Sequence, residues 1–159
     1  MTDITPLDAI RIISIKYENK DGIYEGEILH GLRHGKGTET THEGQIYIGE
    51  YINGNFHGKG RVIMKKSKTF IKGNFENGHI SGFAKRTSPR GTYKGNFVNS
   101  KRHGHGTYIW KDTKYKYIGM WENGNQHGYG KLYKNGLLIE GEFIDGIFVG
   151  QLPGHLARQ

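Results

Sequence analysis

Histidine is the residue type in this sequence that first suggests chemistry, since there are nine of them. Four occupy the same slot, ten residues after an aromatic residue and just before Gly-x-Gly: His34, His57, His103 and His127. In stacked hairpins, equivalent slots lie two strand widths apart, about 9–10 Å. Zn–N bonds of about 2.0–2.1 Å cannot be shared across that gap. We therefore expect these rings to pack at hairpin corners, and we expect no metal site.

Other catalytic arrangements are also missing from the sequence. It has no Cys, no G-x-S-x-G motif and no Walker loop. The glycine-rich run at 104–106 does not lead into a helix that could cradle a phosphate. Between residues 59 and 116 the carboxylates are too sparse for a paired acid–base site, with only Glu76 and Asp112. We expect no enzymatic activity and no cofactor.

Repeated units of about 23 residues must position whatever functional side chains exist. Within one unit, residues 47–52 alternate as in a strand, with Tyr47, Gly49 and Tyr51 facing one way. Asn53-Gly54 then opens a loop, and residues 58–60 lead into a return strand over 61–64. The units begin, at intervals of 22 to 24 residues, at Tyr24, Tyr47, Ile71, Tyr93, Tyr117 and Ile139.

The motif Tyr-x-Gly, followed by an aromatic residue and later by His-Gly-x-Gly, resembles the MORN repeat (membrane occupation and recognition nexus). The resemblance covers about residues 23–150. The motif is imperfect in the third, fourth and last units, at Ile71, Ser81, Ala84, Ser100, Val149 and Leu152. The resemblance implies an all-β fold: an elongated, twisted, single-layer antiparallel sheet with a groove along one face. It also implies a scaffold or adaptor, in some cases linked to membranes or the cytoskeleton.

The chain divides into three parts on this interpretation. Residues 1–22 form a tail and a capping strand that covers the first edge. Residues 23–152 form the array, with five clear units and a degenerate sixth, and residues 153–159 form a tail. Either end of the sheet could pair with a second copy. The lack of Cys and of any apolar run of about 20 residues makes the cytoplasm the expected location.

Aromatic and aliphatic residues at the first position of each unit, and four residues later, are predicted to form a continuous stripe. One hypothesis is that this stripe is simply the core. The other is that it stays open to solvent, because a one-layer sheet has nothing to cover it unless it curls tightly. A helix or an extended peptide would then bind there. The predicted groove residues are Tyr47, Tyr51, Phe75, Tyr93, Phe97, Tyr117 and Trp121.

The net charge of +8 is concentrated in the middle of the chain. Residues 59–116 contain 15 Lys and Arg against 2 acids, or +13, whereas residues 1–58 carry −4 and residues 117–159 carry −1. Three clusters fall near equivalent hairpin connections and are predicted to line one edge. They comprise Lys65, Lys66 and Lys68, then Lys85, Arg86 and Arg90, then Lys111, Lys114 and Lys116.

This basic edge is either a solvated surface or an anion-binding one. Anionic lipid headgroups or an acidic protein segment would be attracted to it. Nucleic acid is the least favoured partner, because no recognition helix or RNA-binding pattern is present. The first hypothesis is therefore a scaffold whose groove takes a peptide or helix, steered by the edge. The second is a peripheral membrane-tethering module.

Overall fold

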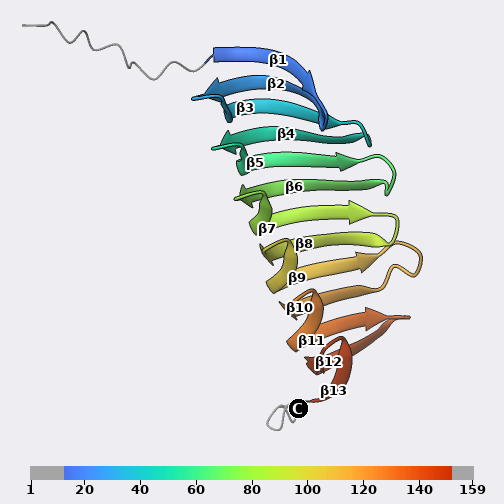
Figure 1. The fold of residues 1–159 in the computed structure, drawn as a ribbon. Coiled ribbons are helices and arrows are strands. Elements are labelled where there is room, and N and C mark those ends of the chain that lie inside the picture. The colour runs from blue at the N-terminus through green and yellow to red at the C-terminus, as the bar shows by residue number, and fades with distance from the viewer. Residues whose placement is uncertain (1–12, 152–159) are drawn as a thin grey trace, which may run out of the picture.

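Thirteen strands form one open antiparallel sheet in which each strand pairs with its neighbours in sequence (Figure 1). The computed structural model describes residues 13–151, and no helix occurs among them. The predicted all-β, single-layer fold is confirmed. Residues 1–12 of the predicted N-terminal segment and the predicted tail at 153–159 lie outside the described residues.

The sheet runs from β1 at one end to β13 at the other, and these two edge strands each have a single neighbour. The strands are β1 Ile13–Asn19, β2 Gly22–Leu29, β3 Leu32–Thr41, β4 Gln45–Ile52, β5 Asn55–Met64, β6 Thr69–Glu76, β7 His79–Ser88, β8 Gly91–Val98, β9 Lys101–Trp110, β10 Lys116–Glu122, β11 Asn125–Lys134, β12 Leu137–Ile144 and β13 Ile147–Gly150.

Two-residue turns, rather than the longer loops expected from the sequence, close the hairpins within each unit. Asn53 and Gly54 have φ values of 49° and 84°, and positive φ at both central residues defines a type I′ turn, which suits the twist of the strands. The return strand therefore starts at Asn55, before residues 58–60, where the sequence predicted its start. The N–H of Gly54 also donates to the carbonyl oxygen of Arg33 in the preceding unit, at 2.9 Å.

A bulge lies where the sequence has His-Gly. The pairing of β4 with β5 shifts between Gly49, opposite Gly60, and Glu50, opposite His57. Gly58 has a φ of 57°, which glycine adopts without steric cost. His57 is thus part of the bulged strand and does not occupy a hairpin corner as predicted. Bulges bend a strand, and the strands are visibly curved (Figure 1).

The bend buries the aromatic stripe without a second layer. Rings four residues apart would stand roughly 13 Å apart on a straight strand, yet the ring centroids of Tyr47 and Tyr51 are 5.1 Å apart. Edge-to-face contacts also join successive units, such as Tyr24 with Tyr51 at 5.3 Å and Tyr117 with Phe143 at 5.0 Å. The curled sheet therefore packs its rings against one another to form the core.

The first tyrosine of a unit is also hydrogen-bonded to its own strand. The phenol of Tyr47 leans over Gly49 and donates to the carbonyl oxygen of Glu50 at 2.9 Å. The phenols of Tyr24, Tyr93 and Tyr117 donate in the same way, three residues ahead. Burial raises the pKa of Tyr47 to about 12. A buried hydroxyl with a partner is typical of a structural ring.

The third unit has a different packing at this point. Ile71 replaces the tyrosine, and Ala84 replaces the glycine that lies opposite Gly73. In the tyrosine units that space is taken: a Cβ atom built on Gly60 would lie 2.5 Å from the phenol oxygen of Tyr47. A side chain without a ring leaves room for the methyl group.

Within residues 13–151, no helix is long or apolar enough to cross a membrane.

Candidate binding groove and basic edge

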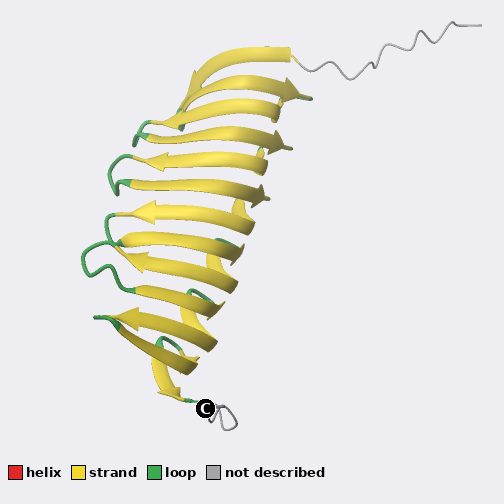
Figure 2. Cartoon of the chain, turned by 180° about the vertical axis from the view of Figure 1, so that it is seen from behind, coloured by secondary structure: helices red, strands yellow, loops and turns green. Residues whose placement is uncertain are grey.

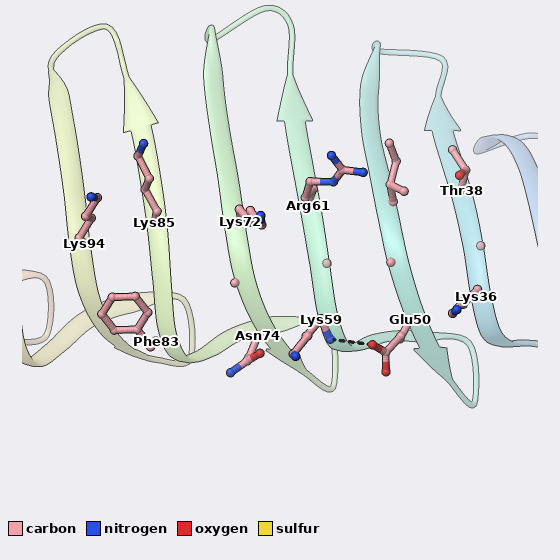
Figure 3. Close-up of a pocket in the computed structure, with 15 residues that line it drawn as sticks. Lys36, Thr38, Glu50, Lys59, Arg61, Lys72, Asn74, Phe83, Lys85 and Lys94 are labelled. Atoms are coloured by element: carbon pink, nitrogen blue, oxygen red, sulfur yellow. Dashed lines mark hydrogen bonds between the residues drawn. The ribbon is translucent and has the colours of Figure 1, made fainter.

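A groove of about 1180 Å³ crosses strands β3 to β8. Its side chains come from positions that alternate with Tyr47 and Tyr51, so it lies on the face opposite the rings. Figure 3 shows these side chains in two rows across the strands. The first row consists of residues that pair from strand to strand: Thr38, Ile48, Arg61, Lys72, Lys85 and Lys94. The second row consists of Lys36, Glu50, Lys59, Asn74 and Phe83.

Glycine backbone lies between the two rows. Gly49 and Gly60 pair directly with each other, and Gly60 pairs with Gly73. Cβ atoms built at Gly49 and Gly60 would meet the phenol oxygen of Tyr47, so they would point to the ring face. The packing of the rings therefore requires glycine here. On the groove side the backbone is bare at these positions because any side chain here would point to the ring face. A ligand can approach this backbone closely.

The groove is strongly cationic. Six of its lining residues carry positive charge and one, Glu50, carries negative charge. The carboxylate of Glu50 accepts a hydrogen bond from the backbone N–H of Lys59 at 3.3 Å (Figure 3). Phe83 is 63% exposed and is therefore available for an apolar contact in the groove. The lining thus combines positive charge with two apolar side chains, Phe83 and Ile48, and favours an anionic, partly apolar ligand.

The seven rings predicted to line a partner groove are not accessible in this way. Their exposed fractions lie between 0 and 5%: Tyr47, Tyr51, Phe75, Tyr93, Phe97, Tyr117 and Trp121. The expectation that this stripe stays open to solvent is corrected, because the bent strands bring the rings into mutual contact. A partner could not touch these side chains without displacing the core.

The predicted basic edge is only partly an edge. Lys65, Lys66 and Lys68 lie in the β5–β6 connection, Arg90 in the β7–β8 turn, and Lys111 and Lys114 in the β9–β10 connection. These connections follow one edge of the sheet (Figure 2). Lys116 opens β10.

Lys85 and Arg86 were also assigned to that edge, but they lie within β7. Their side chains point to opposite faces because successive residues of a strand alternate. Lys85 is exposed and lines the groove. Arg86 is opposite Tyr93 and therefore belongs to the ring face. Strand β7 continues to Ser88, so only Arg90 of this cluster lies in the connection.

Sequence reasoning missed most of the groove residues. The period-two pattern already placed three of them on the face opposite the rings, because each directly follows a residue of the ring face: Arg61, Lys72 and Lys94. Their grouping with Lys85 was missed because the four residues are far apart in sequence, at intervals of 11, 13 and 9 residues. Only strand pairing brings them side by side.

Arg102, on the ring face, is a further residue that the sequence interpretation did not single out. Its guanidinium lies on the ring face, 4.3 Å from the ring centre of Trp121, and donates to the carbonyl oxygen of Gly124. Burial lowers its pKa. The comparable Arg33 forms an ion pair with Glu39 at 2.8 Å, whereas Arg102 has no such partner among residues 13–151. Cation–π contact takes the place of the carboxylate.

The histidine slot does not assemble a metal site. His127 lies near the carboxylates of Glu122, at 3.3 Å, and Asp145, at 3.7 Å. No group of three or more His, Cys, Asp or Glu side chains within residues 13–151 could hold a metal ion.

An open antiparallel sheet of tandem hairpins, with its core on one face and a groove on the other, defines a repeat-built binding module. The MORN repeat family model matches residues 24–45, 47–63, 72–92, 93–113 and 117–137. The chain therefore belongs to the MORN repeat family. No curated protein matches the chain significantly.

Proposed function

We propose that this protein is a non-catalytic scaffold or adaptor that holds an elongated segment of a protein partner in the groove opposite the rings. The groove itself is the observation that carries the proposal, since it extends across six strands and is open along its length. Elongated sites of this kind suit helices and extended peptides. The proposal moves the contact surface from the buried rings to the opposite face and keeps the basic edge as a source of electrostatic steering.

The test is to block the groove without changing its charge. Asn74→Trp places a large side chain in the groove at an exposed strand position. Its matched control is Met120→Trp, which occupies the same slot of the fifth unit, is also uncharged and lies outside the groove. Affinity capture from the native cell, followed by binding measurements with the purified partner, should show about tenfold weaker binding for Asn74→Trp only. Equal binding by all three proteins would refute the groove as the site.

A peripheral membrane role is the second candidate. It is favoured by the exposed cations in three connections along one edge: Lys65, Lys66, Lys68, Arg90, Lys111 and Lys114. Each lysine or arginine near an anionic bilayer contributes about 1 kcal/mol of attraction. Flotation with phosphatidylserine vesicles at low salt tests it. Reversal of Lys111, Lys114 and Lys116 to Glu should abolish flotation, and absence of flotation by the unmodified protein rules the membrane role out.

A further inference from the structure

One line of four exposed cations crosses the middle of the groove face. Arg61 lies directly opposite Lys72, Lys72 opposite Lys85, and Lys85 opposite Lys94. Residues directly opposite one another in an antiparallel pair share a face and are close neighbours. We call these four residues on β5 to β8 the cation row. They lie in one of the two rows visible in Figure 3.

The cation row has no internal compensation. Within residues 13–151, none of its four side chains has a carboxylate within ion-pair distance. The same line of paired residues is balanced toward its two ends, by Lys16 with Glu25 at 3.5 Å and by Lys131 with Glu140 at 3.0 Å. Like charges directly opposite each other destabilise a sheet. A bound anionic ligand would relieve that repulsion.

We propose that the cation row binds a short acidic helix of a protein partner, laid across the strands. This inference rests on the proposed function and specifies the occupant of the same groove. Neighbouring strands are about 4.8 Å apart, so the cations recur at about that interval. On one face of a helix, residues three or four apart recur every 4.5–6 Å or so. Alternate residues of an extended strand recur at about 6.6 Å, which fits less well.

The length of the row also limits its ligand. Four cations on adjacent strands span about 14 Å, or roughly ten residues of helix. On the β1 side the line continues through Ile48 and Thr38 to Glu25, and on the β13 side through Thr107 and Ile118. A continuous polyanion or a flat anionic bilayer would extend over these uncharged and acidic positions. A short acidic segment would not.

The apolar lining points to a peptide rather than to nucleic acid. Phe83 is the single aromatic side chain among the described residues that line the groove. Binding of single-stranded nucleic acid relies on several aromatic platforms in succession. One exposed ring, with Ile48 as a separate apolar side chain three strands away, instead suits one or two apolar side chains on an amphipathic helix.

The test uses the full chain and a designed probe. The probe is a fluorescent alanine-based helix of about 16 residues with glutamates at i, i+3 and i+4 spacing along one face and a leucine beside them. Its isomer has the same composition with the glutamates spread around the helix. Anisotropy at low ionic strength should show binding of the one-faced helix at least about tenfold tighter than binding of the isomer. Equal binding of the two, or no binding of the first, overturns the proposal.

A charge-matched pair of variants locates the site. Lys72→Glu/Lys85→Glu reverses two charges of the cation row, and Lys65→Glu/Lys66→Glu reverses two exposed charges at the edge. We expect at least about tenfold weaker binding for the first and less than about twofold for the second. Equal loss in both would show only general electrostatic attraction and overturn the proposal. If the first variant loses its β circular dichroism, Lys72→Gln/Lys85→Gln replaces it.

Two further probes separate the other classes of ligand. Phosphatidylserine vesicles and a single-stranded oligothymidylate are titrated into the same proteins. If either binds through Lys72 and Lys85 while the one-faced helix does not, the row serves that ligand and the proposal fails. The proposed function would survive this result as long as Asn74→Trp still blocks its protein partner. Failure of both experiments would reject the groove itself.

Discussion

The phenol hydroxyl of Tyr47 donates a hydrogen bond to the carbonyl oxygen of Glu50 at 2.9 Å, which places the tyrosine ring across Gly49. A Cβ atom built on Gly49 would lie 2.6 Å from the phenol oxygen of Tyr47. The tyrosine and the glycine of the repeat motif therefore form one unit of structure. The ring takes the place of the missing side chain, and its hydroxyl binds the backbone where the strand bends.

Removal of the Tyr47 hydroxyl should destabilise the protein, whereas removal of the Tyr51 hydroxyl should not. Tyr47→Phe leaves the partly buried carbonyl oxygen of Glu50 with one partner fewer, and we expect a loss of about 1 kcal/mol in the free energy of unfolding. The phenol oxygen of Tyr51 is buried without a hydrogen-bond partner among the described residues. Tyr51→Phe should therefore be neutral or stabilising. Urea denaturation measures both, and equal losses would contradict the assignment.

The third unit should adopt the tyrosine-over-glycine packing of the units that begin with tyrosine only if Ile71 and Ala84 are both replaced. Ile71→Tyr brings a ring over Ala84, whose methyl group occupies the required space, so the single substitution should cost about 1–3 kcal/mol. Ala84→Gly removes that methyl group. The double variant should be more stable than the sum of the single changes predicts, with a coupling of at least about 1 kcal/mol in a double-mutant cycle. Additive effects would show that the two positions are independent.

Stability should fall in alkaline solution. Burial raises the pKa values of four tyrosines from 10.0 to about 12: Tyr24, Tyr47, Tyr93 and Tyr117. The unfolded chain releases these protons near pH 10, before the folded chain does, so the stability from the neutral rings is complete below pH 10 and is lost between about pH 10 and 12. Urea midpoints across this range, with tyrosinate absorbance followed in parallel, test it. A flat profile up to pH 12 would contradict it.

The cation row should lower the stability of the sheet. Lys72→Glu places a carboxylate between Arg61 and Lys85 and converts two repulsive cross-strand pairs into attractive ones. We expect the free energy of unfolding to rise by about 0.5 kcal/mol, limited by solvent exposure. Lys65→Glu is the control, since it lies in a connection and not in a strand pair. An equal gain from both substitutions would reflect only the lower net charge, and the rise should shrink in high salt.

Much of the architecture could be read from the sequence because it is local. The recurrence of Tyr-x-Gly in phase predicted the hairpins, and Asn53-Gly54 marked a reversal of the chain. The turn was tighter than expected, because both residues adopt positive φ and allow the strand to restart at Asn55. The bulge at His57-Gly58 was missed, since period-two alternation carries no information about an inserted residue.

The binding surface was the weaker part of the sequence interpretation. The stripe that contains Tyr51 and Trp121 was predicted correctly as a stripe, but its accessibility depends on how tightly the sheet bends. That bend comes from bulges and ring contacts between units, which are not encoded at any single position. The grouping of Lys72 with Lys85 had the same origin, since it depends on pairing between β6 and β7.

The sequence by itself determined the repeat, the alternation of side chains between two faces, and the excess of positive charge in the middle units, because each of these follows from residue order and the two-residue period of a strand. Only the tertiary structure decided which face is closed and which is open. Bent strands press Tyr47 and its counterparts together on one face. On the other face, the register of strand pairing aligns Arg61 on β5 with Lys94 on β8.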